Sequence, residues 1–205
     1  MKKNFFNNLI QNKFKDTKVI VEVSGNHQGT LKKFRELIRR AISANVDAVK
    51  FQVYTADTIS LNTRKKDFLI SPQKKWKGIN SRYKIYEKAH TPWKWIEILS
   101  KDLNKKSIPW FATPFDNSAL KFLEDLRCPA YKIASPEIND LNFIEKIASK
   151  NKPIIISTGM ASLKDLDLAV KVIRKKHNQI AILKCTSSYP AEYNELNLQL
   201  IKFLK

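Results

Sequence analysis

The sequence predicts an α/β fold, an incomplete (β/α)8 barrel of the TIM type with about six of the eight βα units. Three observations support this. Short apolar runs rich in β-branched residues alternate with amphipathic helical patterns, which is typical of parallel strands joined by right-handed crossovers. The runs are almost continuously apolar, as in strands that are covered on both faces. Polar residues follow nearly every run, as at the carboxyl face of a barrel.

A doubly wound sheet is the alternative for the same alternation. Its usual dinucleotide-binding signature is G-x-G-x-x-G, whereas the chain has only four glycines, of which Gly25 and Gly29 form GxxxG. The barrel is therefore favoured. Residues 1–17 are expected to form a surface segment, and residues 18–205 a partial barrel domain. Its strands are expected at residues 18–23, 47–52, 108–112, 130–134, 153–157 and 180–184.

Residues suited to helix capping precede the amphipathic stretches between these strands. Thr30 is an expected N-cap, and Thr91 is another, with Pro92 at the first helical position. Ser162 and Asp165 are spaced as a capping box, in which each satisfies an amide of the first turn. The remaining expected N-caps are Asp116 and Asp140.

Residues 60–90 interrupt this rhythm with a long, basic connection after the second strand. Connections of this length inside a compact domain are usually lids or disordered segments. The aromatic residues favour a lid, because they offer apolar surface that orders a loop. They are Trp76, Tyr83 and Tyr86.

The net charge of +19 admits nucleic acid, an anionic membrane or a phosphorylated substrate as partner. The 38 Lys and Arg residues are scattered along the chain, however, which favours a solvated surface and no nucleic-acid partner. No apolar run approaches 18 residues, so no membrane span is expected. Cys128 and Cys185 fit no metal or redox spacing, and we expect buried thiols in a reducing cytoplasm.

Two lysines lie inside apolar strands, where a neutral side chain would cost less free energy. Lys50 occurs in DAVKFQ and Lys132 in AYKIAS. An ammonium group in such a place is tolerated when an anion compensates it, although a lysine can also extend its charge to solvent. Hydroxyl groups at neighbouring strand ends add donors for a phosphate or carboxylate: Thr113, Ser135, Ser157 and Ser187.

Two acids and a histidine lie at the same strand ends. Glu22 and Glu137 are suited to proton transfer or to binding sugar hydroxyls, or they pair with the lysines. His27 is a candidate metal ligand or general acid, although a lone His after a strand is more often a hydrogen-bonded structural group. The chain lacks HxH and HExxH motifs, so no metal site is predicted from its residues.

Several motifs together carry a specific resemblance. They are VEVSGNHQGTL, DAVKFQVYTADT, FATPFD, PAYKIASPEI, KPIIISTGMASL and LKCTSSYPAEYNELNL. In this order they resemble the sialic acid synthase (N-acetylneuraminate synthase) family, from about residue 18 to the end of the chain. SGNH, YTADT and YEKAHTPWKW look most like the pseudaminic acid synthases of that family.

The resemblance implies a role for individual residues. Glu22 and Lys132 are expected to be catalytic, with Glu22 near the reaction centre. Residues at positions that bind phosphoenolpyruvate are Lys50, Thr113, Lys132, Ser135, Ser157 and Ser187, the last matching an asparagine in some members. Residues on the sugar side are Asn26, His27, Glu137 and Tyr189.

The implied reaction condenses phosphoenolpyruvate with an acetamido sugar to give a nine-carbon 2-keto acid and phosphate. The favoured sugar is 2,4-diacetamido-2,4,6-trideoxy-altrose, which would make the product pseudaminic acid. The resemblance also implies a divalent metal, Mn²⁺ or Mg²⁺, and a homodimer. The family's metal-binding histidines and its C-terminal antifreeze-like domain have no match up to Lys205, so we expect a truncated or split synthase.

Three other functions stay open. The chain is alternatively an N-acetylneuraminate synthase that uses N-acetylmannosamine. It is alternatively an inactive basic barrel fragment that binds anionic ligands. A third reading is an aldolase-type barrel in which Lys132 forms a Schiff base.

Overall fold

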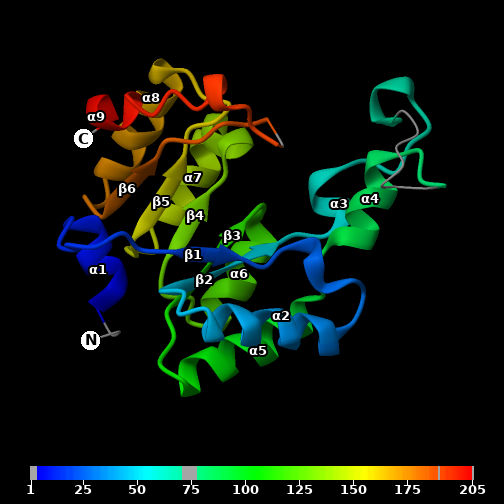
Figure 1. Ribbon diagram of the computed structural model, residues 1–205. Coiled ribbons are helices and arrows are strands. Elements are labelled where there is room, and N and C mark those ends of the chain that lie inside the picture. The colour runs from blue at the N-terminus through cyan, green and yellow to red at the C-terminus, as the bar shows by residue number, and fades with distance from the viewer. Residues whose placement is uncertain (1–3, 71–77, 189, 205) are drawn as a thin grey trace. The chain divides into compact units, whose positions relative to one another are not determined.

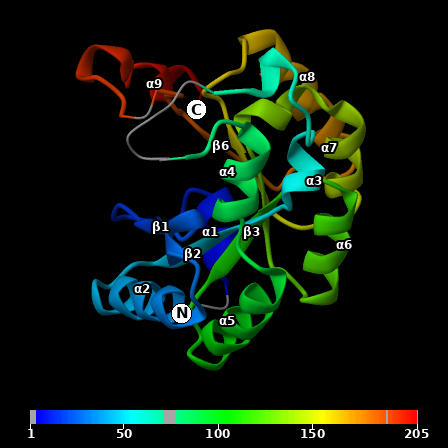
Figure 2. The same ribbon diagram turned by 90° about the vertical axis from the view of Figure 1, so that its right-hand side faces the viewer.

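The computed structural model describes residues 4–70, 78–188 and 190–204. In that part of the chain short strands alternate with helices (Figures 1 and 2). The strands are β1 (Ile20–Glu22), β2 (Ala48–Val53), β3 (Trp110–Pro114), β4 (Tyr131–Ile133), β5 (Ile154–Ser157) and β6 (Ile180–Leu183). The helices are α1 (Phe5–Ile10), α2 (Leu31–Ser43), α3 (Ala56–Ile59), α4 (Arg82–Ala89), α5 (Trp93–Lys105), α6 (Asn117–Asp125), α7 (Leu141–Ala148), α8 (Leu163–Arg174) and α9 (Leu200–Leu204). Short 3-10 turns are η2 (Gly25–His27), η3 (Lys66–Phe68), η5 (Ser135–Asn139) and η6 (Tyr193–Glu195).

The chain forms two compact units. The first unit comprises residues 18–127, and the second comprises residues 1–17 together with 128–205. Each predicted strand is found within two residues of its expected bounds, and each is followed by a helix. The expected fold class, an incomplete (β/α)8 barrel, is confirmed by this order of elements and by the solved structures described below.

In the first unit β1, β2 and β3 pair in parallel. The register places Ile20 opposite Ala48 and Val49 opposite Trp110. Helices α2 and α5 cover the same side of this sheet (Figures 1 and 2). Phe34 of α2, Phe51 of β2 and Trp110 of β3 are almost completely buried and pack edge to face. The apolar stripe of α2 is what anchors this helix, since burial of each large side chain contributes about 1.5–3 kcal/mol.

The long connection after β2 carries α3, η3 and α4. An isolated antiparallel bridge joins Leu69 to Ser81. Tyr83 donates a hydrogen bond of 2.8 Å to Asp57, and the ring of Tyr86 packs edge to face on Tyr54. Two of the three aromatic residues that predicted a lid therefore make ordering contacts, while Trp76 lies outside the described residues. Closure of this connection over a ligand stays a prediction.

The second unit contains β4, β5 and β6, which are also parallel. Its core is mostly isoleucine, with Ile144, Ile154 and Ile156 fully buried. Within the N-terminal segment expected at the surface, α1 buries Phe5 and Phe6 and contacts β6. The adjacent phenylalanines indicate burial, but nothing near them in the sequence identifies β6 as the strand that they contact.

Most of the expected caps are confirmed. The side chains of Thr30, Asp116 and Asp140 accept hydrogen bonds from backbone amides of the first helical turn. Ser162 and Asp165 form the predicted capping box at α8. The cap expected at Thr91 is wrong, because α5 begins one residue later than predicted. Pro92 takes the N-cap position there, while Thr91 is buried. Within the described ranges, none of the helices is long and apolar enough to cross a membrane.

Candidate active site

Three polar residues meet at the carboxyl ends of the strands in the first unit. Parallel register pairs Glu22 with Lys50, and side chains two apart on a strand share a face. The Nζ of Lys50 lies 2.7 Å from Oε2 of Glu22 and donates to Oγ1 of Thr113 over 3.3 Å. We call these three residues the Lys50 cluster.

The Lys50 cluster is a buried cation beside an acid that reaches solvent. Lys50 is 5% exposed and Thr113 is fully buried, whereas the Glu22 side chain is 38% exposed. Lys50 therefore does not extend its charge to solvent, and that alternative is excluded for this residue. Of the roles left open for Glu22, pairing with a lysine is the one that the geometry shows. A buried ammonium with a hydroxyl beside it has the chemistry to hold a phosphate or carboxylate oxygen.

One residue on the same face was not among the predicted site residues. The register of β2 and β3 pairs Gln52 with Thr113, and Gln52 is half-buried two residues beyond Lys50. Its amide offers both a donor and an acceptor. Its position two residues after the site lysine, on the same side of the strand, was the signal that could have identified it.

Serine hydroxyls meet in the second unit around Gly159. A Cβ added to Gly159 would lie 2.4 Å from Oγ of Ser187 and 3.3 Å from Oγ of Ser135. The absence of a side chain at Gly159 thus lets these hydroxyls approach the backbone. Ser157 ends β5 and is 4% exposed. We call Ser135, Gly159 and Ser187 the serine cluster, and together they present hydroxyl donors of the kind that bind an anion.

Lys132 and Glu137 lie in the same unit as the serine cluster. Lys132 is half-buried on β4, in register with Ile155 of β5. Burial raises the pKa of the Glu137 carboxyl, and a backbone hydrogen bond and the charge of Lys132 oppose that rise only in part. Oε2 of Glu137 is buried and lacks a hydrogen-bond partner within the described part of the chain. Such a carboxyl is suited to hold a proton or to accept a hydrogen bond from a ligand.

The predicted sugar-side residues behave differently from one another. Asn26 is exposed in η2, and Tyr189 lies outside the described residues. His27 is 2% exposed. Its Nε2 lies 3.1 Å from the carbonyl oxygen of His90, and its Nδ1 accepts a hydrogen bond from the amide of Gly29. These are the contacts of a structural histidine, the alternative that the sequence left open, and sugar binding by His27 stays a prediction.

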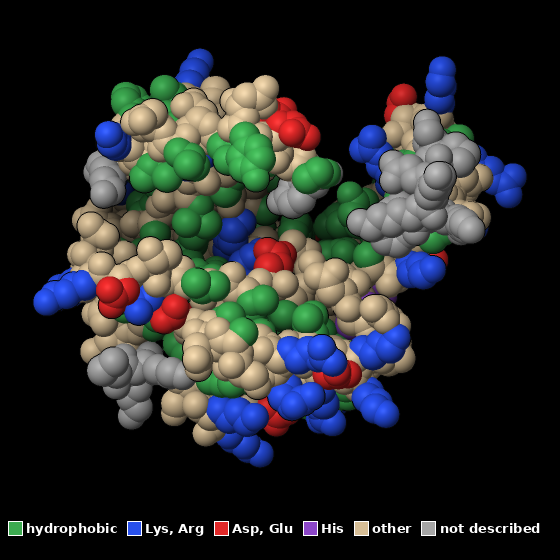
Figure 3. All heavy atoms as spheres, viewed as in Figure 1, with side chains coloured by type: hydrophobic (Ala, Val, Ile, Leu, Met, Phe, Trp, Pro, Cys, Tyr) green, Lys and Arg blue, Asp and Glu red, His purple; other side chains and the backbone are tan. Residues whose placement is uncertain are grey.

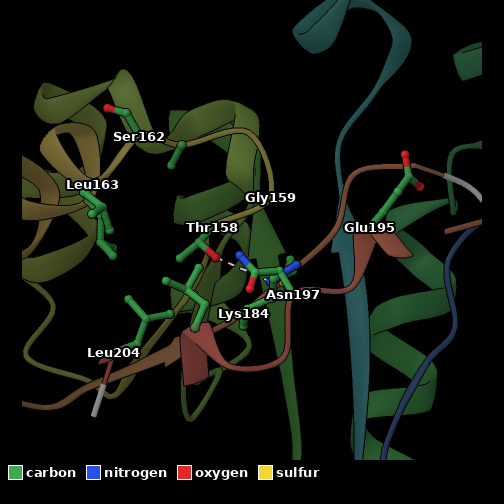
Figure 4. Close-up of a pocket in the computed structure, with 12 residues that line it drawn as sticks. Thr158, Gly159, Ser162, Leu163, Lys184, Glu195, Asn197 and Leu204 are labelled. Atoms are coloured by element: carbon green, nitrogen blue, oxygen red, sulfur yellow. Dashed lines mark hydrogen bonds between the residues drawn. The ribbon is translucent and has the colours of Figure 1, made fainter. Parts of the chain in front are cut away.

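The second unit also contains a cavity of about 280 Å³ at the carboxyl ends of β5 and β6 (Figure 4). Leucines of α8 and α9 line it, and the side chains of Lys184 and Asn197 lie close together within it. Its wall includes Gly159 and Cys185, and a Cβ at Gly159 would touch Cys185. The cavity and the serine cluster therefore share one stretch of backbone.

The residues described do not supply a metal site. No group of three or more His, Cys, Asp or Glu side chains is placed to hold an ion within the described ranges. Glu22 is committed to Lys50, and both ring nitrogens of His27 are engaged with backbone groups. The divalent metal implied by the resemblance thus lacks a fitting donor set among the described residues.

The fold and these clusters define a class of protein, namely a (β/α)8-barrel protein with cationic and hydroxyl groups at the strand ends. A model of the NeuB family matches residues 37–205. The chain belongs to the NeuB family, which confirms the resemblance found in its motifs.

Three of the curated relatives are synthases of two kinds. Pseudaminic acid synthase of Helicobacter pylori is 39% identical over 182 residues, covering 88% of this chain and 53% of the relative. Pseudaminic acid synthase of Campylobacter jejuni is 37% identical over 191 residues, covering 91% and 54%. N,N'-diacetyllegionaminic acid synthase of Campylobacter jejuni is 35% identical, covering 93% and 58%. The chain thus spans about half the length of the curated relatives it matches.

Solved structures support the same family. An N-acetylneuraminic acid synthetase from Leptospira borgpetersenii superposes with a TM-score of 0.77 at 30% identity, covering 91% of this chain and 60% of that one. The spore coat polysaccharide biosynthesis protein spsE of Bacillus subtilis gives 0.73 at 33% identity, covering 93% and 50%. The partial barrel architecture is therefore that of known members of the family.

Proposed function

We propose that this chain provides the phosphoenolpyruvate-binding part of a synthase that condenses phosphoenolpyruvate with an acetamido sugar. The product is a nine-carbon 2-keto sugar acid, and inorganic phosphate is released. The observation that carries the proposal is the buried ammonium of Lys50, which a fold retains at a strand end when it serves an anionic ligand. Membership of a family whose named relatives are such synthases supports it.

Phosphoenolpyruvate carries a phosphate and a carboxylate, which need separate cationic or hydroxyl partners. Lys50 and Thr113 are the proposed anion contacts of the first unit. Those of the second unit are Lys132, Ser135, Ser157 and Ser187. Charge-assisted hydrogen bonds of this type contribute about 1.5–3 kcal/mol each. The hydroxyls add direction, because each aligns with one oxygen of the anion.

The reaction forms one carbon–carbon bond, and at the carbon that carries the phosphate it forms a bond to a water oxygen and breaks the bond to the phosphate oxygen. The methylene carbon of phosphoenolpyruvate attacks the aldehyde carbon of the open-chain sugar, whose oxygen takes a proton and becomes a hydroxyl. A water oxygen adds to the cationic carbon that carries the phosphate and carboxylate. That carbon then loses phosphate and becomes the ketone of the product. The lysines stabilise negative charge on phosphate as the bond to it breaks.

Glu137 is suited to the sugar side of this chemistry. Its raised pKa and its unpartnered Oε2 favour a hydrogen bond with a sugar hydroxyl or a proton transfer near the aldehyde. Glu22 has a different role, because its carboxylate balances the charge of Lys50 between reaction cycles. We propose both acids as functional residues for these separate reasons.

The choice of sugar rests on the relatives. The two pseudaminic acid synthases above are 37–39% identical, whereas N-acetylneuraminate-9-phosphate synthase of mouse is 27% identical. We therefore favour 2,4-diacetamido-2,4,6-trideoxy-altrose over N-acetylmannosamine. On the resemblance alone, we also propose that a protein carrying the relatives' C-terminal part uses Mn²⁺ or Mg²⁺ and is a cytoplasmic homodimer.

The test uses two proteins. One is the 205-residue polypeptide, and the other is a chimera that continues after Lys205 with the C-terminal part of Campylobacter jejuni pseudaminic acid synthase. The chimera is expected to release phosphate from phosphoenolpyruvate only when the diacetamido sugar is present, and Lys132→Ala should abolish most of that release. Release with N-acetylmannosamine alone would overturn the sugar assignment. Borohydride trapping with pyruvate should label nothing, and labelling of Lys132 would instead support the aldolase alternative.

A further inference from the structure

We propose that His27 is a positioning residue that fixes the end of helix α4 against the loop after β1, and with it the wall formed by α3 and α4. Only one part of this proposal rests on the proposed function, namely that α3 and α4 help to select the sugar. In this role His27 does not contact the sugar itself but positions the helices beside it. The contacts of His27 carry it.

The ring of His27 links two segments that lie far apart in the sequence. Its Nε2 is 3.3 Å from the carbonyl oxygen of Ala89 and 3.1 Å from that of His90, where α4 ends. Both partners are acceptors, so Nε2 carries the hydrogen. Nδ1 accepts from the amide of Gly29, 3.0 Å away, which fixes the neutral tautomer.

The surroundings of the ring leave it little freedom to move. His27 is 2% exposed, and its ring packs edge to face on Phe34, with centroids 5.7 Å apart, and on Trp95, with centroids 5.3 Å apart. The backbones also approach closely here, because a Cβ added to Gly25 would lie 2.9 Å from the carbonyl oxygen of Ala89. The histidine and the glycine together permit a tight junction between η2 and the end of α4.

The connection that contains α3 and α4 begins near the Lys50 cluster, because β2 carries Lys50 and ends at Val53. It leaves the carboxyl end of β2 at Tyr54, while the loop that holds His27 leaves the carboxyl end of β1 just after Glu22. Trp93, just beyond the junction, donates a hydrogen bond of 3.2 Å to the carbonyl of Tyr54, which ties the two ends of the connection together.

The connection presents polar groups of the kind that recognise a sugar. The pair of Tyr83 and Asp57 joins α4 to α3, with Asp57 exposed, and the two helices lie side by side in Figures 1 and 2. Loops after the strands of a barrel form the walls of its site. In the proposed function the buried Lys50 and Thr113 bind phosphoenolpyruvate beneath those walls. A sugar with two acetamido groups would then lie against the wall formed by α3 and α4.

Two substitutions of His27 distinguish its hydrogen bonds to the end of α4 from its hydrogen bond within its own loop. In His27→Gln the side-chain amide nitrogen occupies the place of Nε2, so the link to Ala89 and His90 is kept and the acceptor for Gly29 is lost. In His27→Asn the side-chain oxygen occupies the place of Nδ1, so the acceptor is kept and the link is lost. A histidine that only shapes its own loop would tolerate Asn better than Gln, whereas a positioning residue tolerates Gln better.

Hydrogen exchange of the 205-residue polypeptide gives the first readout. Amides of α4 are expected to exchange about tenfold faster in His27→Asn than in the unchanged chain, and within about threefold of it in His27→Gln. Amides of α7 serve as the internal control and should be unchanged. Equal acceleration by both substitutions, or acceleration of α7 as well, would overturn the proposal.

Turnover by the chimera gives the second readout. His27→Asn is expected to raise KM for the sugar about tenfold while leaving KM for phosphoenolpyruvate within about twofold. An equal rise in both constants would refute the role in sugar selection. If the unchanged chimera releases no phosphate with any sugar, the proposed function fails instead, and the exchange result still decides the role of His27.

Discussion

Glu22→Gln is expected to destabilise the fold more than Lys50→Met, although both substitutions break the same ion pair. The lysine is the buried partner, with 6% of its side chain exposed against 38% for the glutamate. Glu22→Gln leaves a buried ammonium without its carboxylate, which costs 3–5 kcal/mol when both groups are buried. Because Glu22 is more than one-third exposed, solvent screening reduces the expected cost to about 1–3 kcal/mol.

Lys50→Met places a side chain of similar length in the same site. The carboxylate of Glu22 then turns to solvent, and the change in the free energy of unfolding is expected to stay within about 1 kcal/mol. For phosphoenolpyruvate binding we expect the opposite order, with Lys50→Met the more harmful of the two substitutions. Lys50→Met should weaken phosphoenolpyruvate binding by roughly tenfold to a hundredfold, whereas Glu22→Gln should preserve or strengthen it, because a competing anion is removed.

Urea unfolding and calorimetric titration with phosphoenolpyruvate, both on the 205-residue polypeptide, measure the two quantities. The double substitution Glu22→Gln with Lys50→Met is the matched control, and it should be more stable than Glu22→Gln alone, since it removes the uncompensated charge. Greater destabilisation by Lys50→Met than by Glu22→Gln would refute the reasoning. An unchanged phosphoenolpyruvate affinity in Lys50→Met would remove Lys50 from the anion site.

Further predictions follow from the second unit. The pKa of Glu137 in the folded state is raised above its ordinary value of 4.5. Its contribution to stability is therefore complete below pH 4.5 and is lost as the pH rises through the raised pKa. The free energy of unfolding, measured across that range, should depend less on pH in Glu137→Gln than in the unchanged chain. Gly159→Ala should weaken phosphoenolpyruvate binding, measured by titration, because the new methyl displaces the Ser187 hydroxyl 2.4 Å away. Ser162→Ala removes the capping box with Asp165 and should lower the free energy of unfolding by about 1 kcal/mol, measured in urea. With Mn²⁺, phosphoenolpyruvate and either sugar, the 205-residue polypeptide should release no phosphate above background, since it spans only about half the length of the synthases it matches. Clear turnover would contradict this.

The strands and most helix starts were predictable because their determinants are local. A run such as PIIIS is buried on both faces whatever surrounds it, and an Asp or Ser before a helix caps it through amides two or three residues away. The prediction at Thr91 failed by one residue, because proline satisfies the backbone requirements of the N-cap position as well as those of the first turn. The burial of Phe5 and Phe6 depends on β6, far along the chain, and no local pattern encodes that distance.

The surface also has features that follow from the sequence itself and features that depend on residues distant in the chain. Lys and Arg side chains of α2 are exposed on its outer face (Figure 3), as expected for charges that form a solvated surface. Apolar side chains are exposed over α8 and α9, including Leu163 and Phe203, which are 55% and 69% exposed (Figure 3). The charges follow from composition alone. The apolar exposure depends on which elements pack beside these helices, and only the three-dimensional structure gives that.

Lys50 and His27 show why one site residue could be interpreted from the sequence and the other could not. A lysine inside an apolar strand is tolerated when an anion compensates it, so its residue type and its strand already favoured this chemistry over extension to solvent. Parallel register then supplied Glu22 as the partner. A histidine after a strand is compatible with a ligand, an acid or a structural link, because its ring both donates and accepts. The choice depends on the carbonyl groups of Ala89 and His90, more than 60 residues further on. Only the long connection between β2 and α5 brings them to the ring, so the role of His27 follows from the path of that connection and not from its own motif.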